Sequence, residues 1–432
     1  TSTKAGISTV TASINGTSRT VDVTFIADSS TATIATGNLT IVTNDAVANG
    51  TTTNSVKVTV TDANAHPLEN QLVTVTADNS AVVGTVDLTD ANGEVTVTLT
   101  STKAGISTVT ASINGSSRTV DVTFMADTTT ATIPAGDLTV VSDDAVADGT
   151  DTNKVKAVVK DAQGNVLANQ TVSFSAGNGA VIAATGSTDV SGEVEMTLTS
   201  TKAGISTVTA SINGTSRTVD VTFIADSSTA TIATGNLTVV TNDAVANGTA
   251  TNSVKVKVTD ANSHPLENQL VTMTSGNSAV VGTVGLTDAN GEVTVTLTST
   301  KAGISTVTAS INGTSQTVDV TFMADTTTAT IPAGDLTVVS DDAVADGTDT
   351  NKVKAVVKDA QGNVLANQTV SFSAGNGAVI AATGSTDVSG EVEMTLTSTK
   401  AGISTVTASI NGTSRTVDVT FIADSSTATI AT

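Results

Sequence analysis

The sequence predicts an all-β protein built from tandem β-sandwiches of about seven strands each. Three observations support this prediction: a repeat of 99 residues, apolar side chains at every second position, and Asn, Asp or Gly where these runs end. A fixed period of domain size is typical of an array in which each repeat contacts its neighbours. The repeat is marked by the octapeptide Thr-Ser-Thr-Lys-Ala-Gly-Ile-Ser, which begins at Thr1, Thr100, Thr199, Thr298 and Thr397.

A second period indicates two types of repeat. Residues 1–198 and 199–396 differ at ten positions, whereas neighbouring repeats differ far more. We therefore call the repeats A-type and B-type. Residues 1–36 are interpreted either as the remnant of a truncated repeat or as a strand pair donated to another chain. The expected domains are 1–28 (the C-terminal strands of a truncated repeat), 29–127 (A-type), 128–226 (B-type), 227–325 (A-type), 326–424 (B-type) and 425–432 (the start of the next repeat).

Within the first B-type repeat, apolar and polar residues alternate with a period of two, which is typical of strands with one buried face. Two weaker runs, Leu138–Val141 and Ala180–Ala184, bring the expected number of strands to about seven. We expect Phe174 and Phe223 to be buried on two facing sheets. The five clear runs place these residues inward: Val155, Ala157 and Val159; Val172 and Phe174; Val194, Met196 and Leu198; Val208, Ala210 and Ile212; Val219, Val221 and Phe223.

Turn residues separate these runs. Asn213-Gly214 joins two alternating runs and predicts a tight hairpin, because both residues tolerate positive φ. Asp161-Ala-Gln-Gly164 has the Asp and Gly of another tight turn. No helical periodicity is found in the sequence. Short strands with turns every 8–12 residues predict a sandwich of two sheets.

A set of motifs recurs in every complete repeat. In the first B-type repeat these motifs are Ser142–Gly149, Lys154–Asp161, Gly164–Phe174, Gly192-Glu-Val, Thr199–Gly204, Val208-Thr-Ala210 and Val219–Phe223. Together they closely resemble the group 1 bacterial immunoglobulin-like repeat found in adhesins of the invasin and intimin type. The resemblance implies a seven-stranded immunoglobulin-like sandwich, display on the bacterial surface, and a stalk of sandwiches arranged end to end as a rod.

Composition excludes several classes of protein. The net charge of −22, from 40 acidic and 18 basic residues, argues against nucleic acid or anionic lipid as a partner. The absence of cysteine excludes a disulfide framework. The sequence contains no run of about 20 apolar residues, so it predicts no membrane-spanning helix. The net negative charge is expected to keep a long rod soluble.

Few residues are candidates for chemistry. His66 and His264 occupy the same loop of the two A-type repeats, and a lone loop histidine that half the repeats lack does not indicate a catalytic or metal site. Lys103 is expected in a solvated turn rather than in a buried Lys–Asn crosslink. The Asn15-Gly-Thr17 sequon is explained by a tight turn.

An acidic cluster near a domain junction has two interpretations. Its carboxylates could bind Ca²⁺, or they could cap backbone amides in a turn in which Gly149 provides the bend. The A-type repeats retain one of the four aspartates, which favours the turn. We therefore expect no catalytic, cofactor-binding or metal-binding residues. The cluster consists of Asp143, Asp144, Asp148 and Asp151.

The sequence thus predicts a structural protein rather than an enzyme. The expected function is a spacer in an extracellular surface adhesin, held in the outer membrane by another segment, that projects a distal binding domain and contributes to adhesion or biofilm formation. Its expected partners are neighbouring repeats, sister chains in a fibre, and a host or surface ligand bound by a different domain. The alternatives are a self-associating filament and binding of polysaccharide by the repeats. The absence of Tyr and Trp favours the spacer, because aromatic side chains usually stack on sugars.

Overall fold

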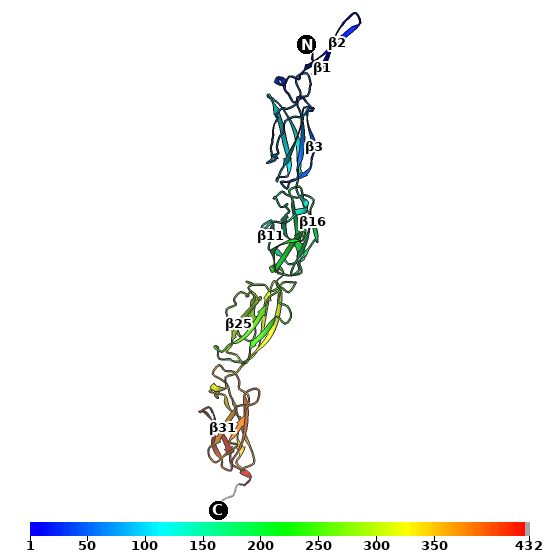
Figure 1. Ribbon diagram of the computed structural model, residues 1–432. Coiled ribbons are helices and arrows are strands. Elements are labelled where there is room, and N and C mark those ends of the chain that lie inside the picture. Colours follow the sequence, from blue (N-terminus) through cyan, green and yellow to red (C-terminus); the bar gives the residue numbers. More distant parts are fainter. Residues whose placement is uncertain (428–432) are drawn as a thin grey trace, which may run out of the picture. The chain divides into compact units, whose positions relative to one another are not determined.

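The structure, a computed structural model, describes residues 1–427 (Figure 1). It divides into two compact units, Thr1–Ile224 and Ala225–Thr432. Each unit contains one A-type and one B-type sandwich, and the first also contains an N-terminal hairpin. The prediction of an all-β chain of tandem sandwiches is confirmed. Within residues 1–427 the helices are single 3-10 turns. The expected start of a further repeat at 425–432 falls largely on 428–432, which lie outside the described residues.

Apart from the N-terminal hairpin of the first unit and the final 3-10 turn of the second, the elements follow one another in the same order in both units. The first unit contains β1 (Gly6–Ile14), β2 (Thr17–Phe25), η1 (Ser29–Thr31), β3 (Leu39–Thr43), β4 (Ala46–Val47), β5 (Asn54–Thr59), β6 (Thr74–Ala77), β7 (Val82–Val83), β8 (Glu94–Thr100), β9 (Gly105–Ile113), β10 (Ser116–Met125), η2 (Thr128–Thr130), β11 (Leu138–Ser142), β12 (Ala145–Val146), β13 (Asn153–Val158), β14 (Thr171–Ala176), β15 (Val181–Ile182), β16 (Thr185–Ser187), β17 (Glu193–Thr199), β18 (Gly204–Ile212) and β19 (Thr215–Ile224). The second contains η3 (Ser227–Thr229), β20 (Leu237–Thr241), β21 (Ala244–Val245), β22 (Asn252–Lys257), β23 (Thr272–Ser275), β24 (Val280–Val281), β25 (Glu292–Thr298), β26 (Gly303–Ile311), β27 (Thr314–Met323), η4 (Thr326–Thr328), β28 (Leu336–Ser340), β29 (Ala343–Val344), β30 (Asn351–Val356), β31 (Thr369–Ala374), β32 (Val379–Ile380), β33 (Thr383–Ser385), β34 (Glu391–Thr397), β35 (Gly402–Ile410), β36 (Thr413–Ile422) and η5 (Ser425–Thr427).

Each sandwich consists of two sheets. In residues 29–127 the strand orders are β3-β5-β8-β7 and β4-β10-β9-β6. In residues 128–226 they are β11-β13-β17-β15 and β12-β19-β18-β14-β16, so the B-type repeat has one more strand at a sheet edge. The long hairpin β18–β19 has the predicted two-residue loop, because Ile212 pairs with Thr215 and Asn213 and Gly214 adopt φ of 48° and 77°.

The first strand of each sandwich contributes to both sheets. In the first A-type repeat β3 pairs with β5, the register shifts between Ile41 and Thr43, and β4 then pairs in parallel with β10 of the other sheet. The buried Asn54 bridges this crossing, because its Oδ1 accepts the Ala46 N–H and its Nδ2 donates to the Thr123 carbonyl. A bulge here bends the strand from one sheet to the other.

The core of the first B-type repeat contains the predicted inward side chains. They are buried, with Val219 partly buried at the margin. One prediction is wrong in detail. Phe174 and Phe223 are 6% and 1% exposed, but they lie on the same sheet rather than on facing ones. β14 pairs with β18, which pairs with β19, so hydrogen bonding places these two strands in one layer.

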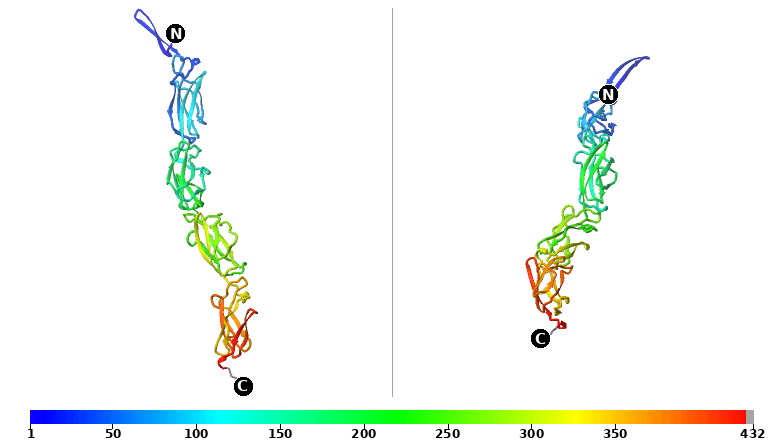
Figure 2. Two further views of the ribbon diagram at one scale, coloured as in Figure 1. Left: turned by 180° about the vertical axis from the view of Figure 1, so that it is seen from behind. Right: turned by 90° about the horizontal axis from the view of Figure 1, so that it is seen from below.

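The N-terminal hairpin is a two-stranded sheet without the second sheet that covers the equivalent strands of the complete repeats (Figure 2). Within residues 1–28, β1 and β2 form a two-stranded sheet. Val10 and Val23 are 53% and 41% exposed, whereas the equivalent Val109 and Val122 of the first A-type repeat are fully buried. The same sequence thus has a hydrophobic face that the complete repeat covers.

Candidate functional site: the joint between repeats

A polar loop recurs once in each repeat, where it contacts the linker that precedes the repeat, and is here called the joint loop. It comprises 62–67 and 260–265 in the A-type repeats and 161–166 and 359–364 in the B-type repeats. The loop is organised by its first residue. Asp62 Oδ1 accepts the backbone N–H groups of Asn64 and His66 at 2.9 and 2.8 Å. An aspartate is suited to this position because its short carboxylate reaches the backbone two and four residues ahead.

The other carboxylate oxygen of Asp62 ties the loop to the linker before it. Oδ2 lies 2.8 Å from Nδ1 of His66 and accepts the backbone N–H of Asp28 at 3.3 Å. Burial of this carboxyl would raise its pKa, but the donors from His66, Asp28 and Asn64 outweigh burial and lower the pKa of Asp62 to about 2. Asp62 is therefore an ionised, fully hydrogen-bonded group although it is only 3% exposed.

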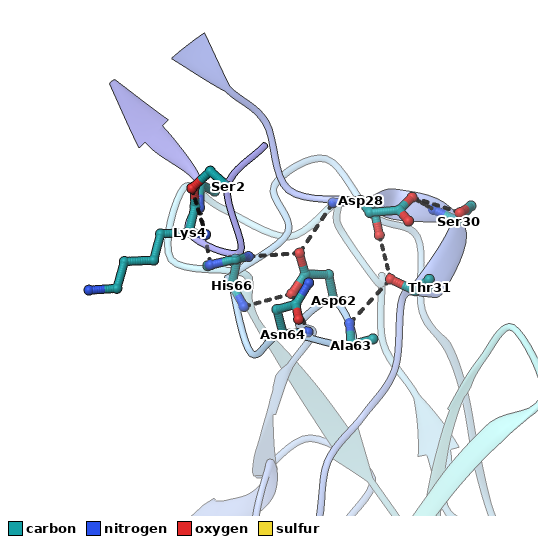
Figure 3. A network of polar contacts seen from close by, with 10 residues as sticks. Ser2, Lys4, Asp28, Ser30, Thr31, Asp62, Ala63, Asn64 and His66 are labelled. Atoms are coloured by element: carbon teal, nitrogen blue, oxygen red, sulfur yellow. Dashed lines mark hydrogen bonds and ion pairs between the residues drawn. The ribbon is translucent and has the colours of Figure 1, made fainter. Parts of the chain in front are cut away.

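The linker has its own cap (Figure 3). Asp28 Oδ1 accepts the backbone N–H of Ser30 at 3.0 Å and so caps the 3-10 turn η1. The Thr31 hydroxyl donates to the carbonyl of Asp28 and accepts the N–H of Ala63 in the joint loop. These contacts hold the linker against the repeat that follows it.

His66 connects the loop to the chain segment that precedes it. The backbone N–H of Ala5 donates to Nε2 of His66 at 3.0 Å, across 61 residues of sequence. Figure 3 shows the ring between the Ser2–Lys4 turn on one side and Asp62 on the other. A backbone N–H can only donate, so Nε2 is an acceptor and Nδ1 carries the proton that is shared with Asp62.

The B-type loop makes the same connections with an asparagine. Asn165 Nδ2 donates to Asp161 Oδ2 at 2.8 Å and to the Thr102 carbonyl at 3.1 Å. Its Oδ1 accepts the N–H of Ala104 at 2.8 Å. The joint of residues 29–127 with 128–226 therefore has two direct hydrogen bonds from one side chain. Asp161 accepts the N–H of Asp127 at 3.1 Å, as Asp62 does from Asp28.

The second unit repeats this chemistry. Asn363 accepts the N–H of Ala302 at 2.8 Å and donates to the Thr300 carbonyl and to Asp359. In the A-type loop, His264 Nδ1 lies 2.8 Å from Asp260 Oδ2. Within the second unit, the contacts of Asn363 can orient and hold residues 326–424 against residues 227–325.

The acidic cluster of the B-type repeats has the geometry of turns. Asp148 Oδ1 accepts the N–H groups of Thr150 and Asp151 at 2.7 and 2.8 Å, and these donors lower the pKa of Asp148. In the A-type repeat, Asn49 Oδ1 makes the equivalent bonds to Thr51 and Thr52. One acceptor oxygen is sufficient for this role, so Asp and Asn are interchangeable.

Asp143 is explained in the same way, because its Oδ1 accepts the N–H of Thr222 at 2.6 Å and Asn44 accepts that of Thr123 in the A-type repeat. Asp144 lies in the same turn at a φ of 60°. Among residues 1–427 no group of three or more His, Cys, Asp or Glu side chains is arranged to hold a metal ion. Within the same described range no helix is long and apolar enough to cross a membrane.

Lys103 lies exposed in a turn closed by Ser101, whose hydroxyl accepts the Lys103 N–H and donates to the Lys103 carbonyl. The neighbouring backbone of this turn, at Thr102 and Ala104, forms the joint. The sequence predicts that His66 lies in a loop and Lys103 in a turn. It does not predict that a loop of the first kind contacts a turn of the second kind in the preceding segment. A signal was available: the fifth residue of the joint loop is His, Asn, His and Asn, always four after an Asp.

Comparison with known proteins agrees with this architecture. The model of the bacterial Ig-like domain (group 1) matches residues 36–125, 135–224, 234–323 and 333–422. The chain is 34% identical over 391 residues to the inverse autotransporter adhesin YeeJ of Escherichia coli (strain K12), which is 85% of this chain and 16% of that protein. It is 41% identical over 80 residues to invasin of Yersinia enterocolitica, covering 18% of this chain and 10% of that protein.

Solved structures include invasin, described as a bacterial integrin-binding protein, at 23% identity and a TM-score of 0.44, with 88% of this chain and 78% of that chain covered. The Escherichia coli adhesin FdeC gives 22% identity and a TM-score of 0.46, with 69% and 100% covered. The chain thus spans 16% and 10% of the length of the two curated relatives, while the family matches cover most of its own residues. The chain belongs to the family of group 1 bacterial Ig-like domains.

Proposed function

We propose that this chain is a segment of the stalk of a bacterial cell-surface adhesin. In this function it is a spacer that holds a distal binding domain away from the cell, and a different segment anchors it in the outer membrane. The family membership and the similarity to an inverse autotransporter adhesin support the proposal. The function requires length and stiffness and no catalytic chemistry.

The joint is the observation that carries the proposal. Asn165 and Asn363 bind the backbone of the preceding repeat with equal distances, 2.8 Å to an Ala N–H and 3.1 Å to a Thr carbonyl. Because the partner atoms are backbone groups of a turn that recurs every 99 residues, repeats can be added without a new interface. A spacer needs this property, whereas a binding module needs a distinct surface.

The domain boundaries belong to the same proposal. We take 29–127, 128–226, 227–325 and 326–424 as the folding units, with linkers that end at Asp28, Asp127, Asp226 and Asp325. Each of these aspartates donates its N–H to the first residue of the following joint loop. Expression of residues 128–226 alone should give a cooperatively folded domain, and a disordered product would contradict these boundaries.

The spacer function can be tested by changing the number of repeats in the chain. Chains with two, four and six complete repeats should increase in maximum dimension by about 40 Å per repeat in small-angle scattering, from strands of about ten residues plus loops. The comparison is a four-repeat chain that carries Asn165→Ala and Asn363→Ala. Its domains should stay folded, but its maximum dimension should be smaller than that of the parent chain. A maximum dimension that does not grow with repeat number would overturn the spacer function, and growth with protein concentration would favour the self-associating filament.

A further inference from the structure

His66 and Asn165 occupy equivalent positions and perform the same pairing with different chemistry. Each directs one N–H at the carboxylate that begins its loop and one acceptor at a backbone N–H of the preceding segment. The amide of Asn165 has its donor and acceptor at every pH. The imidazole of His66 has them in one state alone, neutral with the proton on Nδ1.

The charged groups at the His66 joint come from three segments. Asp62 belongs to the joint loop itself and contacts Nδ1. Asp28 comes from the linker, where its carboxylate caps Ser30 rather than facing the ring. Lys4 comes from the preceding turn, and Figure 3 shows its side chain directed away from the ring. Because hydrogen bonds hold the pKa of Asp62 at about 2, that carboxylate stays ionised while histidines titrate.

Protonation of the ring would change one contact and keep the other. A proton on Nε2 would face the N–H of Ala5, and two donors that now lie 3.0 Å apart cannot bond. The Nδ1 contact with Asp62 would become an ion pair, so the ring would stay in its own loop. The joint would open while the loop remained folded. The open joint binds one more proton than the closed one, so acid favours opening.

We propose that the joint made by His66 is released by mild acid, whereas the joints made by Asn165 and Asn363 are not. The chain then combines joints of two kinds, one that responds to pH and one that does not. Among side chains, imidazole is the one whose unperturbed charge change falls between about pH 5 and pH 8, so the test compares these conditions. This inference concerns the joint and does not depend on the spacer function.

The chain contains no cysteine, so pairs of spin labels can be attached at chosen sites. Thr20, Thr119 and Thr218 are exposed strand residues at equivalent positions, 99 residues apart. Labels on Thr20→Cys and Thr119→Cys span the His66 joint, and labels on Thr119→Cys and Thr218→Cys span the Asn165 joint. Distance distributions in the full chain are then measured by double electron–electron resonance at about pH 7.5 and about pH 5.

We expect the distribution across the His66 joint to broaden at about pH 5 and to recover at about pH 7.5. The His66→Asn variant should abolish this change, because the amide does not titrate. Across the Asn165 joint the parent should show no change, and Asn165→His should introduce one. The equilibrium should shift by about two- to tenfold, as expected for one hydrogen bond.

Two outcomes would overturn the proposal. One is a pH response of equal size in the parent and in His66→Asn, which would assign the response to other groups. The other is an Asn165→His variant that keeps the parent distribution at both pH values. If Asn165→His already has a broadened distribution at about pH 7.5, that variant is not a test of the pH response. The proposal then depends on the comparison of the parent with His66→Asn across the His66 joint.

Discussion

Asn153 and Thr222 lie 69 residues apart in the sequence, and the Asn153 side chain donates to the Thr222 carbonyl at 2.7 Å. The same side chain accepts the N–H of Ala145 at 3.0 Å. Asn153 is fully buried on β13 of one sheet, while its partners belong to β19 and β12 of the other. One amide thus satisfies two backbone groups at the point where the first strand changes sheets.

Replacing this residue should weaken the first B-type repeat. Asn153→Ala removes the acceptor of the Ala145 N–H and leaves the Thr222 carbonyl with the Asp144 N–H as its remaining donor, so the free energy of unfolding should fall by about 1–3 kcal/mol. Urea denaturation of residues 128–226 measures the change. The exposed Gln163→Ala is the matched control and should have little effect. An equally small effect of Asn153→Ala would show that water or relaxed backbone replaces its bonds.

The B-type core is expected to reject a methyl group at Gly186. A Cβ there would lie 2.6 Å from Cγ2 of Val194 and 2.8 Å from Sδ of Met196. Gly186→Ala should therefore destabilise the repeat by about 1–3 kcal/mol through overpacking. The control is Gly285→Ala at the equivalent A-type position, where a Cβ meets nothing within 4 Å. Thermal unfolding measures the loss of stability caused by each variant in its own repeat. Gly186→Ala should cause the larger loss, and equal losses would contradict this packing.

The stability of the first A-type repeat should depend on Asp62 at low pH. Its pKa is lowered from 3.8 to about 2 in the fold, so its contribution is complete above about pH 4 and is lost as the pH falls through about 2. The contribution should be about 2 kcal/mol. Denaturant unfolding of residues 1–127 at about pH 6 and about pH 2 measures it. In Asp62→Asn the difference between the two pH values should shrink by this amount.

Alternation of repeat types should reduce misassembly between neighbours. Phe174 and Met196 stand where the A-type repeat has Val75 and Val97, so a strand exchanged between adjacent repeats would leave a poor core. A chain of four A-type copies should therefore refold with more misfolded species than the parent. Single-molecule stretch and relaxation would show these species as steps of doubled contour length. Equal frequencies in the two chains would assign the alternation to duplication history.

Local patterns predicted most of the secondary structure. The alternation of Val208, Ala210 and Ile212 depends on the two-residue period of a strand, and burial of these residues agrees with it. The Asn213-Gly214 turn was predicted because positive φ is a local property of the two residues. The 99-residue period and the two types of repeat can likewise be read directly from the sequence.

Tertiary structure alone decided which segments meet. Phe174 and Phe223 share a sheet because β18 pairs with both of their strands, and a period of two says nothing about pairing partners. The role of Asn165 depends on a backbone N–H 61 residues away, and that of Asn153 on a carbonyl 69 residues away. The local order of residues along the chain determines which side chains are buried and where turns form. Long-range hydrogen bonding determines which donor reaches which acceptor, and the joint is a consequence of that pairing.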